Sequence, residues 1–99
     1  GVAMSTYNGW TNYETWNVAL WIDNEQGTYE EARDMARRAR SVGDLARSVR
    51  AWVEDMAPDL GASMFADLLG AALSEVDWDE IAGHWYDEAH EDDEVEAGA

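Results

Sequence analysis

Residues 8–29 constrain the fold more than any other stretch of this chain. The segment, NGWTNYETWNVALWIDNEQGTY, holds three of the six tryptophans and two of the four tyrosines. Thr11 is followed three residues later by Glu14, which is the capping-box pattern of a helix start, so we expect a helix from about Asn12. This helix should end before Gly27, because glycine readily takes the left-handed conformation that stops helices. Apolar side chains fall on most of its sides, which predicts a central element covered by several neighbours.

The remaining chain predicts four more helices, each with apolar residues at helical spacing. The second opens at a further capping box, formed by Thr28 and Glu31. The third ends at the single proline, because the residue before a proline is pushed out of the helical region. The expected helices run from Tyr29 to Arg40, from an Asp44 cap to Pro58, from about Ser63 to Ser74, and from an Asp77 cap to about His90.

No segment alternates with the period of two that strands show, so the expected fold is all-α. Connections of two to five residues favour antiparallel neighbours in one compact domain. Residues 1–10 read as a flexible lead-in with Met4 as the native start, residues 11–90 as the helical domain, and residues 91–99 as an acidic, disordered tail with little to bury. In the fourth helix we expect the apolar residues to face inward: Met64, Phe65, Leu68, Leu69, Ala72 and Leu73.

Charge is distributed unevenly along the chain. Residues 1–50 carry seven acidic side chains and six arginines, whereas residues 51–99 carry fifteen acidic side chains and no basic ones, giving the net charge of −16. Such a chain repels nucleic acid and anionic membranes and can attract a basic protein surface. The alternatives are that the acidity only aids solvation or reflects adaptation to high salt.

Composition also limits the compartment and the chemistry. There is no cysteine, which excludes a disulfide framework and a thiolate metal site. No apolar run approaches the roughly 20 residues of a membrane span and no signal peptide is recognisable, so we expect a cytoplasmic protein. There is no nucleophile–base pair and no phosphate-binding glycine loop, so we expect no enzyme activity, no catalytic residue and no cofactor. His84, Glu88 and His90 lack the spacing of a closed ligand set, so we expect no metal site.

Two groups of residues are candidates for binding a partner. The first group combines two tryptophans that fit the inward-facing apolar stripes of the helices less well with acidic residues of the fifth helix. Exposed tryptophan and carboxylate side chains can together bind a basic protein surface. The second is a set of arginines that can bind phosphates, although pairing with the chain's own carboxylates is the favoured interpretation. The first group is Trp10, Trp21, Asp79, Glu80, Asp87 and Glu88, and the second is Arg33, Arg37, Arg40, Arg47 and Arg50.

Two motifs resemble a family of small uncharacterised proteins carried by phages, plasmids and similar mobile elements. The first is NYETWNVALWI, from Asn12 to Ile22, and the second is the Trp-x-x-Ile-Ala pattern that begins at Trp78. The resemblance implies a mobile-element accessory protein and no activity.

Together with the charge, this resemblance favours a non-enzymatic module that binds a basic host protein, in the manner of a DNA mimic. One alternative is a nucleic-acid-associated protein that uses the arginines. The other is a structural or oligomeric helical protein, and a homodimer is one possible oligomeric state.

Overall fold

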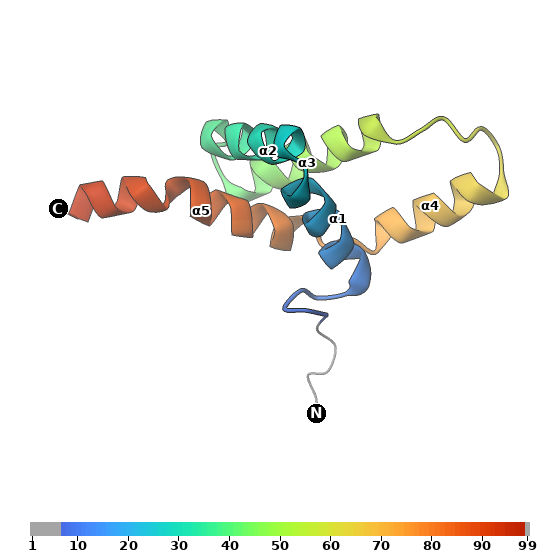
Figure 1. Ribbon diagram of the computed structural model, residues 1–99, viewed down its shortest axis with the longest axis horizontal. Helices are drawn as coiled ribbons and strands as arrows, with labels where there is room; N and C mark the ends of the chain where they lie inside the picture. Colours follow the sequence, from blue (N-terminus) through green and yellow to red (C-terminus); the bar gives the residue numbers. More distant parts are fainter. Residues whose placement is uncertain (1–6, 99) are drawn as a thin grey trace, which may run out of the picture.

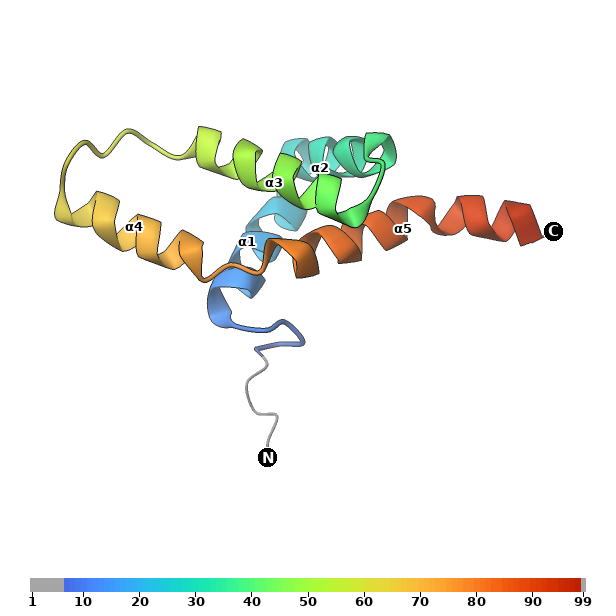
Figure 2. The same ribbon diagram turned by 180° about the vertical axis from the view of Figure 1, so that it is seen from behind.

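The structure, a computed structural model, describes the backbone of residues 7–98 and the side chains of residues 7–90. Five α-helices form the regular elements of this part, which confirms the all-α prediction. Four of them pack together, while α4 lies to one side of this body (Figures 1 and 2). The helices are α1 (Tyr13–Asn24), α2 (Gln26–Arg38), α3 (Val42–Met56), α4 (Met64–Ser74) and α5 (Trp78–Gly98).

Side chains cap the starts of α1, α3, α4 and α5, but at two of these helices the capping residue differs from the predicted one. The carboxamide of Asn12, and not Thr11, accepts the Thr15 N–H at 2.9 Å, because asparagine is at least as good a cap as threonine. The Ser41 hydroxyl caps α3 in place of the predicted Asp44, and it accepts the N–H of Asp44 at 3.0 Å. Asp44 lies in the first turn and accepts the Arg40 N–H, so the two residues share the capping.

The predicted cap at Asp77 is confirmed, and Ser63, where the fourth helix was expected to begin, caps α4. Ser63 accepts the N–H of Ala66 at 3.1 Å, and Asp77 accepts the N–H of Glu80 at 3.0 Å. These two caps fix where the helices on either side of the α4–α5 connection begin.

The junction between α1 and α2 is tighter than the sequence predicts. Gly27 does not end α1, which stops at Asn24, and Gly27 lies in the first turn of α2. The Thr28 hydroxyl donates to the carbonyl of Ile22 at 2.8 Å and so satisfies a free carbonyl at the end of α1. The predicted capping box at Thr28 is therefore wrong, since this hydroxyl closes the corner between the helices.

The core lies among α1, α2, α3 and α5. Leu45 and Val49 of α3 and Ile81 of α5 are fully buried. Ala32 and Ala36 of α2 are also buried, and their small side chains let α2 approach its neighbours closely. Of the tryptophans predicted to face inward, Trp78 and Trp85 are buried, whereas Trp16 and Trp52 are half-buried.

α4 differs from the other helices because none of its residues is buried. The prediction that its apolar side chains face inward is wrong for Met64, Phe65 and Leu68, which are 65%, 62% and 61% exposed. Only its last turn reaches the core, through Leu73. The physical reason is position: the connection from α3 carries α4 away from the body before the chain returns to α5 (Figure 1).

Residues 7–10 form a turn and not a free lead-in; residues 1–6 lie outside the described part. Asn8 and Gly9 have φ angles of +49° and +91°, which is the combination that a two-residue hairpin turn requires. The Trp10 N–H donates to the Tyr7 carbonyl at 2.8 Å, and the Tyr7 ring contacts those of Tyr13 and Trp16. An Asn-Gly pair is the sequence signal that indicates this turn.

The backbone of α5 continues as helix to Gly98, whereas the sequence predicts a disordered tail from residue 91. Extending an existing helix needs no new nucleus, and the segment is rich in glutamate and alanine, which are good helix formers. Its side chains lie outside the described residues.

Candidate functional site

The two sequence motifs meet in space at the start of α1. The Thr15 hydroxyl, fully buried, accepts the Asp77 N–H at 2.9 Å and donates to the Asn12 side chain at 2.6 Å. Asn12 in turn donates to the Glu75 carbonyl at 2.7 Å, and the Thr11 N–H donates to the Glu80 carboxylate at 3.0 Å. Three of these bonds join the start of α1 to the α4–α5 connection and the start of α5, and each satisfies a backbone group outside the helices.

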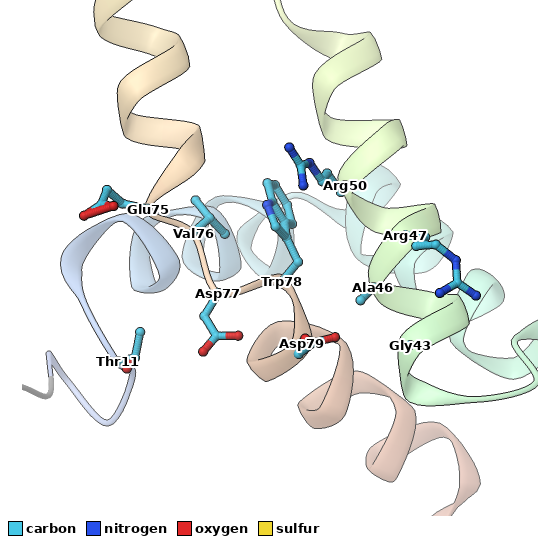
Figure 3. A pocket seen from close by; sticks show the side chains of 10 residues that line it. All are labelled: Thr11, Gly43, Ala46, Arg47, Arg50, Glu75, Val76, Asp77, Trp78 and Asp79. Carbon is cyan, nitrogen blue, oxygen red and sulfur yellow. The ribbon is translucent and has the colours of Figure 1, made fainter.

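A cleft of about 550 Å³ opens beside this junction, between α3 and the start of α5 (Figure 3). Arginines of α3 line one side of it and carboxylates of the α4–α5 connection line the other. Its lining residues are Thr11, Gly43, Ala46, Arg47, Arg50, Glu75, Val76, Asp77, Trp78 and Asp79.

The two arginines of the cleft are paired on their own helix. Arg50 lies 3.1 Å from the Glu54 carboxylate, and Arg47 lies 3.9 Å from that of Asp44. Across the cleft, within residues 7–90, no guanidinium lies within ion-pair distance of Asp77 or Asp79. The charge on the α5 side of the cleft is therefore only partly compensated.

The structure divides the predicted acidic residues into two pairs. Glu80 accepts the Thr11 N–H, and Glu88 forms an ion pair of 2.6 Å with Arg33 of α2, so both help to hold the fold together. Asp79 and Asp87 are exposed, and none of the described cations lies within ion-pair distance of them. Only the second pair is free for a partner.

The predicted basic residues do not form one unpaired patch. Arg33 reaches α5 and lies over the Tyr29 ring, and Arg37 is 3.6 Å from Asp34 in its own helix. Arg40 is exposed at the α2–α3 turn, whereas Arg47 and Arg50 face the cleft. Most of these guanidinium groups thus have a nearby carboxylate.

The two candidate tryptophans lie in different environments. Trp10 is half-buried, packs against the core, and its ring meets that of His84 edge-on at 5.4 Å. Trp21 is 62% exposed. It lines an open apolar groove of about 190 Å³ between α1 and α3, together with Asn17, Val18, Ile22, Val53 and Met56.

Sequence reasoning singled out Trp21 but missed the rest of this apolar surface. Met56 is 49% exposed beside the groove, and α4 adds the three exposed side chains described above. The available signal was the sequence of α4, MFADLLGAALS, which has a single charged residue and is apolar on more sides than one core can cover.

Comparison with known proteins identifies the family. Residues 3–97 match a family of unknown function, DUF7249. The chain belongs to the DUF7249 family. No curated protein and no solved structure matches it. The family match spans both motifs of the junction and assigns no activity to them.

Histidines of this DUF7249 chain lie in structural contacts. His90 lies 3.1 Å from the Ala36 carbonyl and stacks on Tyr86, and His84 lies 3.8 Å from Glu88. Among the described residues, no group of three metal-ligating side chains converges, and no helix is long and apolar enough to cross a membrane.

One carboxyl of the DUF7249 chain has a perturbed pKa. Partial burial raises the pKa of Asp23, at the end of α1, and the negative charge of Glu88 adds to the rise. The indole N–H of Trp85 and the charge of His84 oppose the rise. The Trp85 nitrogen is buried without a hydrogen bond of good geometry, so the carboxylate compensates it incompletely. Because Asp23 as a whole remains exposed, water weakens all these effects.

Proposed function

We propose that this protein is a non-enzymatic protein-binding module whose partner presents a basic surface. The binding surface is the acidic rim, which we define as Glu75, Asp77 and Asp79 at the cleft together with Asp87 about two turns further along α5. One observation carries the proposal: most arginines form ion pairs with carboxylates close to them in sequence. Among the described residues, the carboxylates of the rim are therefore left without an ion pair to an arginine.

The non-enzymatic character is supported by the lining of the cleft. It offers carboxylates, guanidinium groups and one threonine, and the described lining contains no histidine or serine that could act as base or nucleophile. A role in a phage or plasmid is the part of the proposal that rests on the resemblance of the two motifs.

The rim favours a basic protein in general over DNA mimicry in particular. Mimicry needs regularly spaced carboxylates that are free to replace phosphates. Glu80 and Glu88, which would complete such a series on α5, are engaged with Thr11 and Arg33. The rim would therefore act mainly by accelerating and orienting the encounter, in a salt-dependent way.

The experiment measures the affinity for an arginine-rich peptide at low and moderate salt. The rim variant Asp79→Asn with Asp87→Asn is compared with the control Glu25→Gln with Glu30→Gln, which removes the same charge from the first part of α2 and its cap. We expect the rim variant to bind about three- to tenfold more weakly at low salt, since each exposed ion pair contributes up to about 1 kcal/mol. The control should bind like the wild type. An equal loss in both variants would mean that only net charge matters and would overturn the proposal.

A further inference from the structure

The strongest feature outside the acidic rim is the uncovered apolar surface. Met64, Phe65 and Leu68 lie exposed on α4, and Trp21 and Met56 lie exposed at the groove between α1 and α3. A helix that is apolar on several sides is normally buried. The exposed side chains of α4 lie within about one turn of each other, and an exposed apolar patch on a protein usually marks an interface.

Charge restricts what can cover this surface. The chain carries a net charge of −16, so it repels anionic lipid and also repels a second copy of itself over most of its surface. The uncovered region is the exception, because α4 holds a single charged residue, Asp67, and none of the described residues that line the groove is charged. Two copies can therefore approach closely at this region with little repulsion.

The same chain also provides two shapes that fit each other. α4 projects from the body on the connection between Met56 and Met64 (Figure 2), and no residue of α4 lines the groove between α1 and α3. The groove has a volume of about 190 Å³. An apolar cavity of about 150 Å³ can hold benzene, so the groove can accept one side chain of the size of Phe65.

We propose that two copies of this chain associate by reciprocal exchange, with α4 of each copy lying in the groove between α1 and α3 of the other. The contact is the same in both directions, which gives a closed twofold dimer and no filament. The exposed parts of the five side chains amount to on the order of 500 Å² per copy if a whole aromatic side chain counts as about 150–250 Å². Two copies would then bury about 1,000 Å², which is where specific interfaces begin.

The test is sedimentation of the full chain over a wide range of protein concentration. The wild type should pass from monomer to dimer. An α4 variant, Phe65→Gln with Leu68→Gln, and a groove variant, Trp21→Gln, should each raise the dimer Kd by more than about tenfold. Tyr13→Gln, which removes a half-exposed aromatic outside the surface, is the control and should dimerise normally.

Two further measurements decide the geometry. An equal mixture of the α4 variant and the groove variant should form a heterodimer, since one intact α4 meets one intact groove, and pairing of α4 with α4 would give none.

The chain has no cysteine, so Leu68→Cys copies mixed with Val53→Cys copies report contact between copies by disulfide formation. A wild type that stays monomeric, or a link that forms only when both cysteines are in one chain, would overturn the proposal. Unchanged thermal melting of the variants shows that they are folded.

Discussion

α3 and α4 carry similar apolar stripes, yet only one of them is covered. Leu45 and Val49 of α3 are completely buried against α5 and α2, whereas Phe65 and Leu68 of α4 are about three-fifths exposed. Periodicity in a sequence identifies the apolar face of a helix, but it does not identify what lies opposite that face. In α3 the opposite surface belongs to the same chain, and in α4 we infer that it belongs to another copy.

The largest expected difference between the two helices is in folding stability. Leu45→Ala should lower the free energy of unfolding by about 2–5 kcal/mol, because it leaves a cavity in the core. Leu68→Ala should lower it by less than about 1 kcal/mol in the monomer, since the side chain is already in contact with water. Urea denaturation at low protein concentration measures both. Similar losses would show that α4 is packed in the monomer after all.

A smaller effect is expected where α4 joins the body. Thr15→Val removes the hydroxyl that accepts the Asp77 N–H and donates to Asn12, and it leaves the Asp77 N–H without its acceptor. We expect a loss of about 1–3 kcal/mol in the free energy of unfolding. Thr11→Val is the matched control, because Thr11 is exposed and contributes its backbone N–H. If the control costs as much as Thr15→Val, the junction does not depend on the buried hydroxyl.

The smallest effect concerns the pKa of Asp23. Because its folded pKa is raised, folding binds protons, and stability falls as the pH rises through the range between the unfolded and folded pKa values. Asp23→Asn should therefore raise the melting temperature slightly at neutral pH, and the gain should vanish at acidic pH, where the carboxyl is protonated in both states. A gain that is the same at every pH would assign the effect to something other than this carboxyl.

The fold was largely predictable because its signals are local. The number of helices, the cap at Asp77, the start of α4 near Ser63 and the stripe of α3 follow from spacing and side-chain type. The errors at Gly27 and Thr28 arose because a tight helix–helix corner can use a threonine hydroxyl in place of a left-handed glycine.

The surfaces were less predictable because they depend on tertiary placement. Glu80 and Glu88 have the same local pattern as Asp79 and Asp87, but their partners lie more than fifty residues away. The sequence likewise gave no sign that the connection after α3 would hold α4 away from the core. The match of the arginines with nearby carboxylates was predictable, since most of these pairs are one helical turn apart.

The central claim is that α4 is uncovered in a single copy and becomes covered by a second. Amide hydrogen exchange measured residue by residue at low and high protein concentration tests this claim most directly. We expect the amides of α3 around Val49 to be strongly protected at both concentrations. Those of α4 around Leu68 should exchange rapidly in dilute protein and become protected as the concentration rises. Strong protection of α4 in dilute protein, or rapid exchange at every concentration, would contradict the claim.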